Sequence, residues 1–421
     1  MNPSMLRIRL TNAILIILLL SACGVPATTA VPVTSTVTPI PPTITATATI
    51  TPTATPADTS TPSPLLHLCK LPEAAHHRDI GLGFPRYATR MVSTGTVRAK
   101  VIFVDFSDAP ANETPEQVFS RISPGAPDFY RAVSYNRLNL ELEPHFAWLR
   151  MSKPSTEYMF ERGLSFDLHK AYVQEAITLA DGEVDFSDVQ AVYVMANPEA
   201  TAISYGPGFT PVDKSFGIPV DGNTITNGAT SGFDLKDWGF LWLNHEAGHT
   251  LGLVDLYSYE NTSNYDDIYR FVGNFSLMGY IAGRVPEPLA YERWLLGWID
   301  DDQIICQPTG EETTTLSAIE KEGGIKAVIV PTGPTSAVIV ESRRALGYDS
   351  NIIKPGSLVY SIDTSISTGQ GPIRVFPMKD NDPYRDQSPL AVGESVTVGN
   401  VTITVTDASA DGDTVQVTVA E

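Results

Sequence analysis

The sequence predicts an α/β (α+β) domain followed by an all-β domain, and two patterns along the chain support this prediction. Between residues 96 and 310, short apolar runs typical of buried strands alternate with segments that repeat apolar residues at helical spacing. From residue 311 to residue 421, β-rich runs follow one another between turn signals, without a long helical segment. We therefore expect a layered domain of strands and helices and then a sandwich-like domain.

Residues 1–23 have the features of an export signal. Two arginines precede an apolar run that is too short for a comfortable transmembrane helix. The run is followed by Leu20-Ser21-Ala22-Cys23, which resembles the lipobox of bacterial lipoproteins. This resemblance implies that Cys23 becomes the lipidated first residue of the mature protein. The alternative is a plain secretory signal, and in both cases we expect an extracytoplasmic protein, lipid-anchored at the bacterial cell surface or secreted.

Two further segments precede the first domain. Residues 24–64 are rich in Thr, Pro, Ala, Val and Ser, a composition that cannot bury a core, so we expect an extended, disordered linker. Residues 65–95 form an N-terminal segment, and the sequence leaves open whether it covers a cleft. Cys69 and Cys306 could form one disulfide in an oxidising compartment, but their separation in sequence does not show that they are close.

The first domain has a regular succession of expected elements. Strands are predicted at Ala99–Phe106, Leu138–Leu142 and Gln190–Ala196, and helices at Thr114–Ile122, Ala126–Ser134, Phe166–Ala180 and Glu287–Trp298. Ser204–Gly232 is rich in Gly, Thr and Asn, which indicates loops and an edge strand bordering a cleft. Tyr257–Arg270 is polar and predicts a surface loop.

The stretch WGFLWLNHEAGHTLGLVDLY, from Trp238 to Tyr257, carries the chemistry. His245 and His249 are four residues apart and therefore share one face of a helix, where both imidazoles can bind one metal ion. Glu246 stands beside that ion, where a carboxylate can take a proton from a metal-bound water. The helix is apolar on two sides and so is expected to be buried, which means that its polar groups need partners. A metal ion supplies them.

A catalytic zinc ion usually has three protein ligands and one open position. No histidine follows His249, so a downstream ligand must be of another type, and Asp255 is the natural candidate. Gly252 can adopt a left-handed conformation that ends the helix and turns the chain back towards the ion. The alternative is a glutamate from the later helix, Glu287 or Glu292.

The segment NFSLMGY, from Asn274 to Tyr280, offers two residues for the surroundings of the metal. Met278 could form an apolar floor beneath the ligands, although a simple core role is the commonest use of methionine. Tyr280 could donate a hydrogen bond to the oxyanion that develops during hydrolysis.

HEAGHTLGLVDLY followed by SLMGY resembles the metzincin clan of zinc peptidases, and more specifically the immune inhibitor A-like family, peptidase family M6. The resemblance extends from VIFVDFSD, which begins at Val101, to ERWLLGWID, which ends at Asp300, and continues more weakly into the C-terminal region. It implies a metzincin-like first domain with the following roles: zinc ligands His245, His249 and Asp255, general base Glu246, Met-turn Met278, and active-site tyrosine Tyr280.

Together these features predict a zinc-dependent endopeptidase, expected to be a monomer, that acts on extracellular proteins or peptides. The alternative is a surface-anchored binding protein or adhesin that keeps the fold but does little catalysis. With 28 Lys and Arg against 48 Asp and Glu, the net charge of −20 argues against nucleic acid as a partner. Asp380, Asp382 and Asp386 could hold a structural calcium ion, although a solvated acidic turn is the simpler interpretation.

Overall fold

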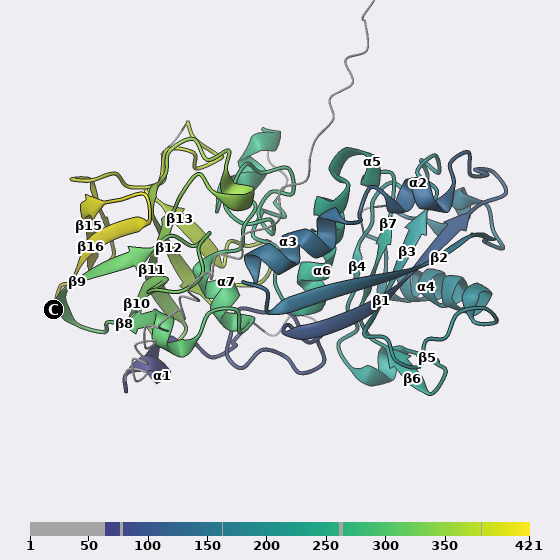
Figure 1. Cartoon of the computed structure of the whole chain (residues 1–421), viewed down its shortest axis with the longest axis horizontal. Helices are drawn as coiled ribbons and strands as arrows, with labels where there is room; N and C mark the ends of the chain where they lie inside the picture. The colour runs from purple at the N-terminus through teal and green to yellow at the C-terminus, as the bar shows by residue number, and fades with distance from the viewer. Residues whose placement is uncertain (1–63, 76–78, 162, 261–263, 380) are drawn as a thin grey trace, which may run out of the picture. The chain divides into compact units, whose positions relative to one another are not determined.

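The structure, a computed structural model, describes residues 64–75, 79–161, 163–260, 264–379 and 381–421. The predicted signal segment with Cys23, nearly all of the predicted linker, and Asp380 lie outside the described residues. The described residues form a mixed α/β protein with several sheets (Figure 1). None of the helices in these ranges is both long and apolar enough to cross a membrane.

The first sheet contains five strands in the order β2-β1-β3-β7-β4. They are β1 (Gly95–Asp105), β2 (Leu138–Arg150), β3 (Ala191–Ala196), β4 (Gly208–Phe209) and β7 (Gly228–Ser231). All neighbouring pairs are parallel except β4, which runs antiparallel to β7 and forms one edge. Strand β2 continues eight residues beyond the predicted end at Leu142, because pairing with β1 holds the less regular stretch 143–150 in the sheet.

Helices cover both faces of this sheet, and β1 shows how the sequence directs its side chains. Ala99, Val101 and Phe103 join a cluster with α3 (Gly125–Val133) and α6 (Phe240–Leu251). Ile102 and Val104 point to the opposite face and join a second cluster with α4 (Phe166–Ala180). The predicted helix at 166–180 is confirmed with the same bounds, and Ser165 caps its first turn by accepting a hydrogen bond from the Leu168 N–H.

The glycine-rich stretch before α6 forms more strand than the sequence indicated. Besides the edge strand β4, it contains the inner strand β7 and a small hairpin of β5 (Ile218–Val220) and β6 (Asn223–Ile225). The segment GATS of β7 lacks the large apolar residues that mark a buried strand. Its place in the sheet depends on small size, because a Cβ atom at Gly228 would lie 2.2 Å from the Val192 carbonyl oxygen.

The C-terminal part contains two sheets, seen at the left of Figure 1, in which all neighbouring strands are antiparallel except β8 and β10. One sheet has the order β13-β12-β11-β10-β8 and the other β14-β15-β16-β9. Their strands are β8 (Ile304–Cys306), β9 (Gly310–Ser317), β10 (Ala327–Pro331), β11 (Ser336–Arg343), β12 (Gly356–Asp363), β13 (Ile373–Phe376), β14 (Ser395–Val398), β15 (Val401–Ala408) and β16 (Gly412–Val419). Residues of both sheets form a shared hydrophobic cluster, among them Val328, Val340 and Val415.

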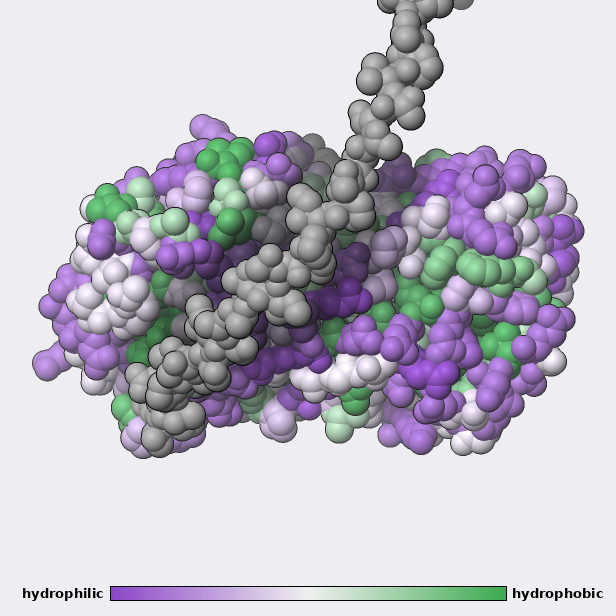
Figure 2. All heavy atoms as spheres, viewed as in Figure 1, coloured by the Kyte–Doolittle hydropathy of each residue, from purple (hydrophilic) through white to green (hydrophobic). Residues whose placement is uncertain are grey.

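The two predicted domains share a hydrophobic core. Ile329, Ile339 and Tyr360, on the other face of the β10–β12 sheet, belong to the same cluster as α3, α6 and α7 (Ala290–Leu295). Strand β8 precedes residue 310 yet pairs with β10 of the C-terminal sheet. The described residues accordingly belong to one compact unit. On the visible part of the face in Figure 2, polar residues predominate and hydrophobic residues occur only in small groups.

The N-terminal segment is attached to both parts of this unit. Cys69 of α1 (Leu66–Cys69) forms a buried disulfide with Cys306 of β8. Further along, the Gly81 N–H donates to the Gly252 carbonyl at 2.9 Å, and the Met91 N–H donates to the Thr250 carbonyl at 2.9 Å. The segment therefore runs along the C-terminal end of α6. Two short helices complete the fold: α2 (Pro115–Phe119) and α5 (Leu235–Trp238).

Candidate metal centre

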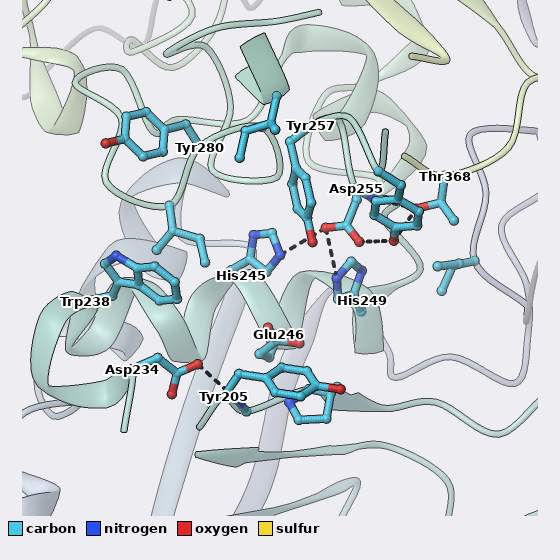
Figure 3. A pocket seen from close by; sticks show the side chains of 18 of the residues that line it. Tyr205, Asp234, Trp238, His245, Glu246, His249, Asp255, Tyr257, Tyr280 and Thr368 are labelled. Carbon is cyan, nitrogen blue, oxygen red and sulfur yellow. Dashed lines mark hydrogen bonds and ion pairs between the residues drawn. The ribbon is translucent and has the colours of Figure 1, made fainter. Parts of the chain in front are cut away.

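Helix α6 supplies the two histidines and ends where the sequence predicted. Gly252 has φ +104°, so its predicted left-handed conformation is confirmed. The Gly252 and Leu253 N–H groups donate back to the His249 and Gly248 carbonyls, each at 2.9 Å, and close the last turn. The chain then reverses and brings Asp255 back towards the two imidazoles (Figure 3).

The three side chains converge on one point. Oδ1 of Asp255 lies 3.1 Å from Nε2 of His245 and 3.4 Å from Nε2 of His249. One potential ligand atom from each residue lies within 4.8 Å of the others, and in the described parts of the chain no other group of His, Cys, Asp or Glu does so. The side chains are nearly buried, with exposed fractions of 4% for His245, 12% for His249 and 8% for Asp255.

Main-chain carbonyls fix the orientation of both imidazoles. Nδ1 of His245 lies 3.0 Å from the Leu277 carbonyl oxygen, and Nδ1 of His249 lies 2.9 Å from the Leu253 carbonyl oxygen. Because a carbonyl only accepts, each Nδ1 must carry the hydrogen. The lone pair of each Nε2 is then directed at the common point, which is the arrangement of metal-binding histidines with a hydrogen-bonded second nitrogen.

The electrostatics of this group favour a cation at the common point. Burial alone would lower the pKa of His249, but the Asp255 carboxylate outweighs it and raises that pKa to about 9. Burial opposes ionisation of Asp255, yet the two histidines hold its pKa well below the usual range. Oδ1 of Asp255 is buried and accepts no well-formed hydrogen bond from the described residues. Two imidazole nitrogens and one carboxylate oxygen fit a zinc ion with one open position.

The second carboxylate oxygen of Asp255, Oδ2, accepts a hydrogen bond from a neighbouring tyrosine. The Tyr259 hydroxyl donates a hydrogen bond of 2.5 Å to Oδ2. This leaves Oδ1 as the oxygen that faces the histidines. Tyr259 was not predicted as a site residue, and because residues 255–259 form neither helix nor strand, its spacing from Asp255 does not indicate the contact.

Glu246 lies beside the group, in the wall of the same cleft. The edge strand β4 passes close to it, since a Cβ atom at Gly208 would lie 3.2 Å from Oε2 of Glu246. Burial raises the pKa of Glu246 to about 7, against the opposing effect of His245 and His249. A carboxyl group with a pKa near 7 can both accept and release a proton at neutral pH.

Met278 lies directly against α6. A Cβ atom at Gly248 would lie 2.5 Å from its sulfur atom, so the thioether packs between the turns that carry the two histidines. The Leu256 N–H donates to the Met278 carbonyl at 2.9 Å, which ties this segment to the chain next to Asp255. Met278 thus packs against the helix that carries the two histidines, a position compatible with the apolar floor suggested from the sequence.

The structure places Tyr280 differently from the role predicted for it. Its ring packs on Tyr269, with ring centroids 4.0 Å apart, and Figure 3 shows its hydroxyl directed away from His245 and Asp255. Tyr257 lies closer: its ring centroid is 6.3 Å from that of His245, and its hydroxyl is directed at the metal-binding group (Figure 3). Of these two tyrosines, Tyr257, two residues after Asp255, is therefore the one whose hydroxyl faces the metal-binding group.

One cavity of about 300 Å³ is lined by His245, Glu246, His249 and Asp255 together with Tyr257 and Tyr280. Aromatic residues form much of its wall, namely Tyr205, Trp238, Tyr257, Tyr259, Tyr269 and Tyr280. Ile80 contributes from the N-terminal segment and Thr368 from the C-terminal part. The cleft is thus built from three separate regions of the chain.

The alternative zinc ligands are engaged elsewhere. Oε2 of Glu287 pairs with Nη2 of Arg293 at 2.5 Å, and Oε2 of Glu292 accepts the Leu289 N–H at 2.8 Å. Neither carboxylate belongs to the convergent group around His245.

The structure gives no support for calcium binding by Asp382 and Asp386, the two described residues of the acidic stretch. The two oxygens of Asp382 accept the main-chain N–H groups of Asp386 and Gln387, at 3.1 and 2.8 Å. Oδ1 of Asp386 accepts a hydrogen bond of 2.7 Å from Asn274. These contacts are those of a hydrogen-bonded turn.

Comparison with protein-family models and with curated proteins finds no match. Among solved structures, metalloproteinase-II from Bacteroides fragilis is similar at 12% identity, over 50% of this chain and 55% of that one, with a TM-score of 0.29. Wild-type OgpA from Akkermansia muciniphila is similar at 13% identity, over 74% of this chain and 87% of that one, also with a TM-score of 0.29. At these TM-scores the resemblance is partial and assigns no function to this chain.

Proposed function

We propose that this protein is a zinc-dependent peptidase with His245, His249 and Asp255 as metal ligands. The observation that carries the proposal is the convergence of two Nε2 lone pairs and a buried carboxylate oxygen in an open cleft. A bound zinc ion would supply Lewis-acid activation of a water molecule and of the scissile carbonyl. The remaining steps belong to residues of the chain.

Glu246 is the proposed general base. Its carboxylate takes the proton of the attacking water and later delivers it to the leaving amine, so that the peptide bond is hydrolysed without a net change in the enzyme. Tyr257 replaces Tyr280 as the proposed oxyanion donor: its O–H would donate to the carbonyl oxygen as negative charge develops there.

The proposed substrates are extracellular proteins or peptides, cleaved within the chain. The cleft is open to the surface and has an aromatic wall suited to bulky side chains. A buried disulfide between Cys69 and Cys306 favours an oxidising compartment. Together with the lipobox-like sequence at Cys23, this supports an enzyme at the bacterial cell surface, lipid-anchored or secreted, which we propose to act as a monomer.

The test is Glu246→Gln, assayed on a peptide library with and without a zinc chelator. We expect the parent to cleave in a chelator-sensitive manner and the variant to lose activity by about 10³-fold or more, while both contain one zinc ion per chain. Glu322→Gln, at an exposed glutamate, is the matched control and should retain full activity.

Equal turnover by Glu246→Gln and the parent would reject the general-base role. If the parent binds zinc but cleaves no peptide in the library, the binding-protein or adhesin alternative is favoured instead.

A further inference from the structure

The loop between β12 and β13, residues 364–372, reaches from the C-terminal β sheet to the metal centre. Thr368 of this loop lines the cleft and is only 5% exposed. Figure 3 shows Thr368 beside Asp255, on the side away from the histidines. The all-β part thus contributes a side chain to the cleft itself.

This loop binds both main-chain groups of Asp255. The Asp255 N–H donates to Oγ1 of Thr368 at 2.9 Å, across 113 positions in the sequence. The Gly369 N–H donates to the Asp255 carbonyl at 3.0 Å. Asp255 lies in an irregular segment after α6, so these two hydrogen bonds replace the support that a helix or strand would give.

The same loop also orients Tyr259. The Tyr259 N–H donates to the Gly369 carbonyl at 2.9 Å, and the Tyr259 hydroxyl donates to Oδ2 of Asp255. The ring lies against the glycine, because a Cβ atom at position 369 would be 2.3 Å from it. Gly369 also has φ +70°, a conformation that glycine adopts at low cost. A side chain at this position would displace the ring.

We propose that Thr368 and Gly369 are positioning residues for the metal centre, which makes the C-terminal β part a component of that centre. They hold the Asp255 main chain directly and its Oδ2 through Tyr259, so that Oδ1 is the oxygen left to face the two Nε2 atoms. Hydrogen bonds to a metal ligand that fix its orientation strengthen metal binding. This inference rests on the proposed function in that the metal is taken to be zinc.

The principal test is Thr368→Val in the full chain. Valine keeps the shape of threonine but removes the acceptor of the Asp255 N–H. We expect the zinc affinity of the metal-free protein, measured by competition with a chromophoric chelator, to fall by about 10- to 100-fold. Thr368→Ser keeps the hydroxyl and should restore most of the affinity. The absorption spectrum of the cobalt-substituted protein should also change in Thr368→Val, which a purely structural role would not cause.

Thr364→Val is the matched control. Thr364 lies in the same loop, is 2% exposed, and donates from Oγ1 to the Pro72 carbonyl at 2.6 Å, away from the metal ligands. Its replacement should lower thermal stability to a similar extent and leave zinc affinity unchanged. Tyr259→Phe, at a residue that is 54% exposed, tests the same arrangement without disturbing the core and should also weaken zinc binding.

The possible outcomes separate the two proposals. If the parent does not bind zinc, the proposed function fails. If the parent binds zinc and Thr368→Val, Tyr259→Phe and the parent have equal affinities, the function stands and the positioning role of the loop is rejected. Should Thr368→Val not fold, Tyr259→Phe and Gly369→Ala decide the question, and equal zinc affinity in those that fold overturns the proposal.

Discussion

Two buried groups of ionisable side chains in this molecule differ in how their charges are arranged. The first is the metal-binding group of His245, His249 and Asp255. The second, which we term the ionic cluster, lies between α7 and the β11 sheet and consists of Glu287, Arg293, Glu341, Arg343 and Asp349. Both contain charges that would be costly to bury alone.

In the ionic cluster the charges are paired within the protein. Arg343 bonds to Glu341 at 2.7 Å and to Asp349 at 2.6 Å, and all three side chains are fully buried. In the metal-binding group, by contrast, each Nδ1 is directed at a main-chain carbonyl, and the two Nε2 atoms and Oδ1 of Asp255 converge beside a cleft. Removing one partner of a buried ion pair leaves an uncompensated charge in the protein, whereas convergent ligand atoms beside a cleft can bind a cation.

The largest effect on zinc affinity should come from removing the carboxylate of Asp255 from the metal-binding group. Asp255→Ala deletes a proposed metal ligand, so zinc affinity should fall by more than the roughly 100-fold that changes around a ligand cause. Elemental analysis and chelator competition measure this. Asp237→Ala, at an exposed aspartate of α5, is the control and should retain zinc. Full zinc occupancy in Asp255→Ala would mean that another residue completes the site.

A substitution in the ionic cluster should lower the stability of the fold and leave zinc affinity unchanged. Arg343→Met leaves Glu341 and Asp349 buried without their partner, which should lower the free energy of unfolding by about 3–5 kcal/mol, measured by urea denaturation. Folded protein should still bind zinc with the affinity of the parent. Arg131→Met breaks an ion pair with Asp128 in which both side chains are 48% exposed, and it should cost less than about 1 kcal/mol. Loss of zinc in folded Arg343→Met would show that the two groups are not independent.

A smaller effect should distinguish two tyrosines of the cleft. Tyr257→Phe removes the hydroxyl that faces the metal-binding group and should lower kcat by about 10²-fold, as expected for loss of one oxyanion donor. Tyr280→Phe removes a hydroxyl that points away and should change kcat little. Steady-state kinetics on one good peptide substrate compare them. The opposite ranking would return the oxyanion role to Tyr280 and imply that its side chain reorients when substrate binds.

These contrasts also show what the sequence could predict. Features that depend on a pattern within one element could be predicted. They are the helix α4 from its apolar spacing, the shared face of His245 and His249 from their four-residue separation, and the turn at Gly252. A helix face or a turn depends on neighbouring residues, so a local pattern specifies it. The convergence of Asp255 with the two histidines followed as well, because that turn leads the chain back to Asp255.

Contacts between distant segments were not predictable. Thr368 and Asp255 are 113 positions apart, and nothing in either local sequence indicates that they meet. The position of Tyr280 was mispredicted for the same reason. Its ring packs with Tyr269 and Tyr384, and the local sequence does not indicate these contacts. Likewise β7 was missed because its pairing with β3 selects small residues and gives no apolar signal.

The smallest predicted effect concerns Glu292, which the sequence left open as a zinc ligand and the structure places in the protein interior. Burial raises the pKa of Glu292 to about 7, against the opposing hydrogen bond from the Leu289 N–H. Between the unfolded pKa near 4.5 and the folded value, the native state therefore binds more protons than the unfolded state, and stability falls as pH rises.

Glu292→Gln keeps the acceptor for Leu289 but cannot ionise. From pH 5.5 to 6.5, the free energy of unfolding of the parent should fall relative to this variant by about 1 kcal/mol, measured by urea denaturation. Zinc content should be the same in both proteins, because Glu292 lies outside the convergent group around His245, and loss of zinc in the variant would place it among the ligands.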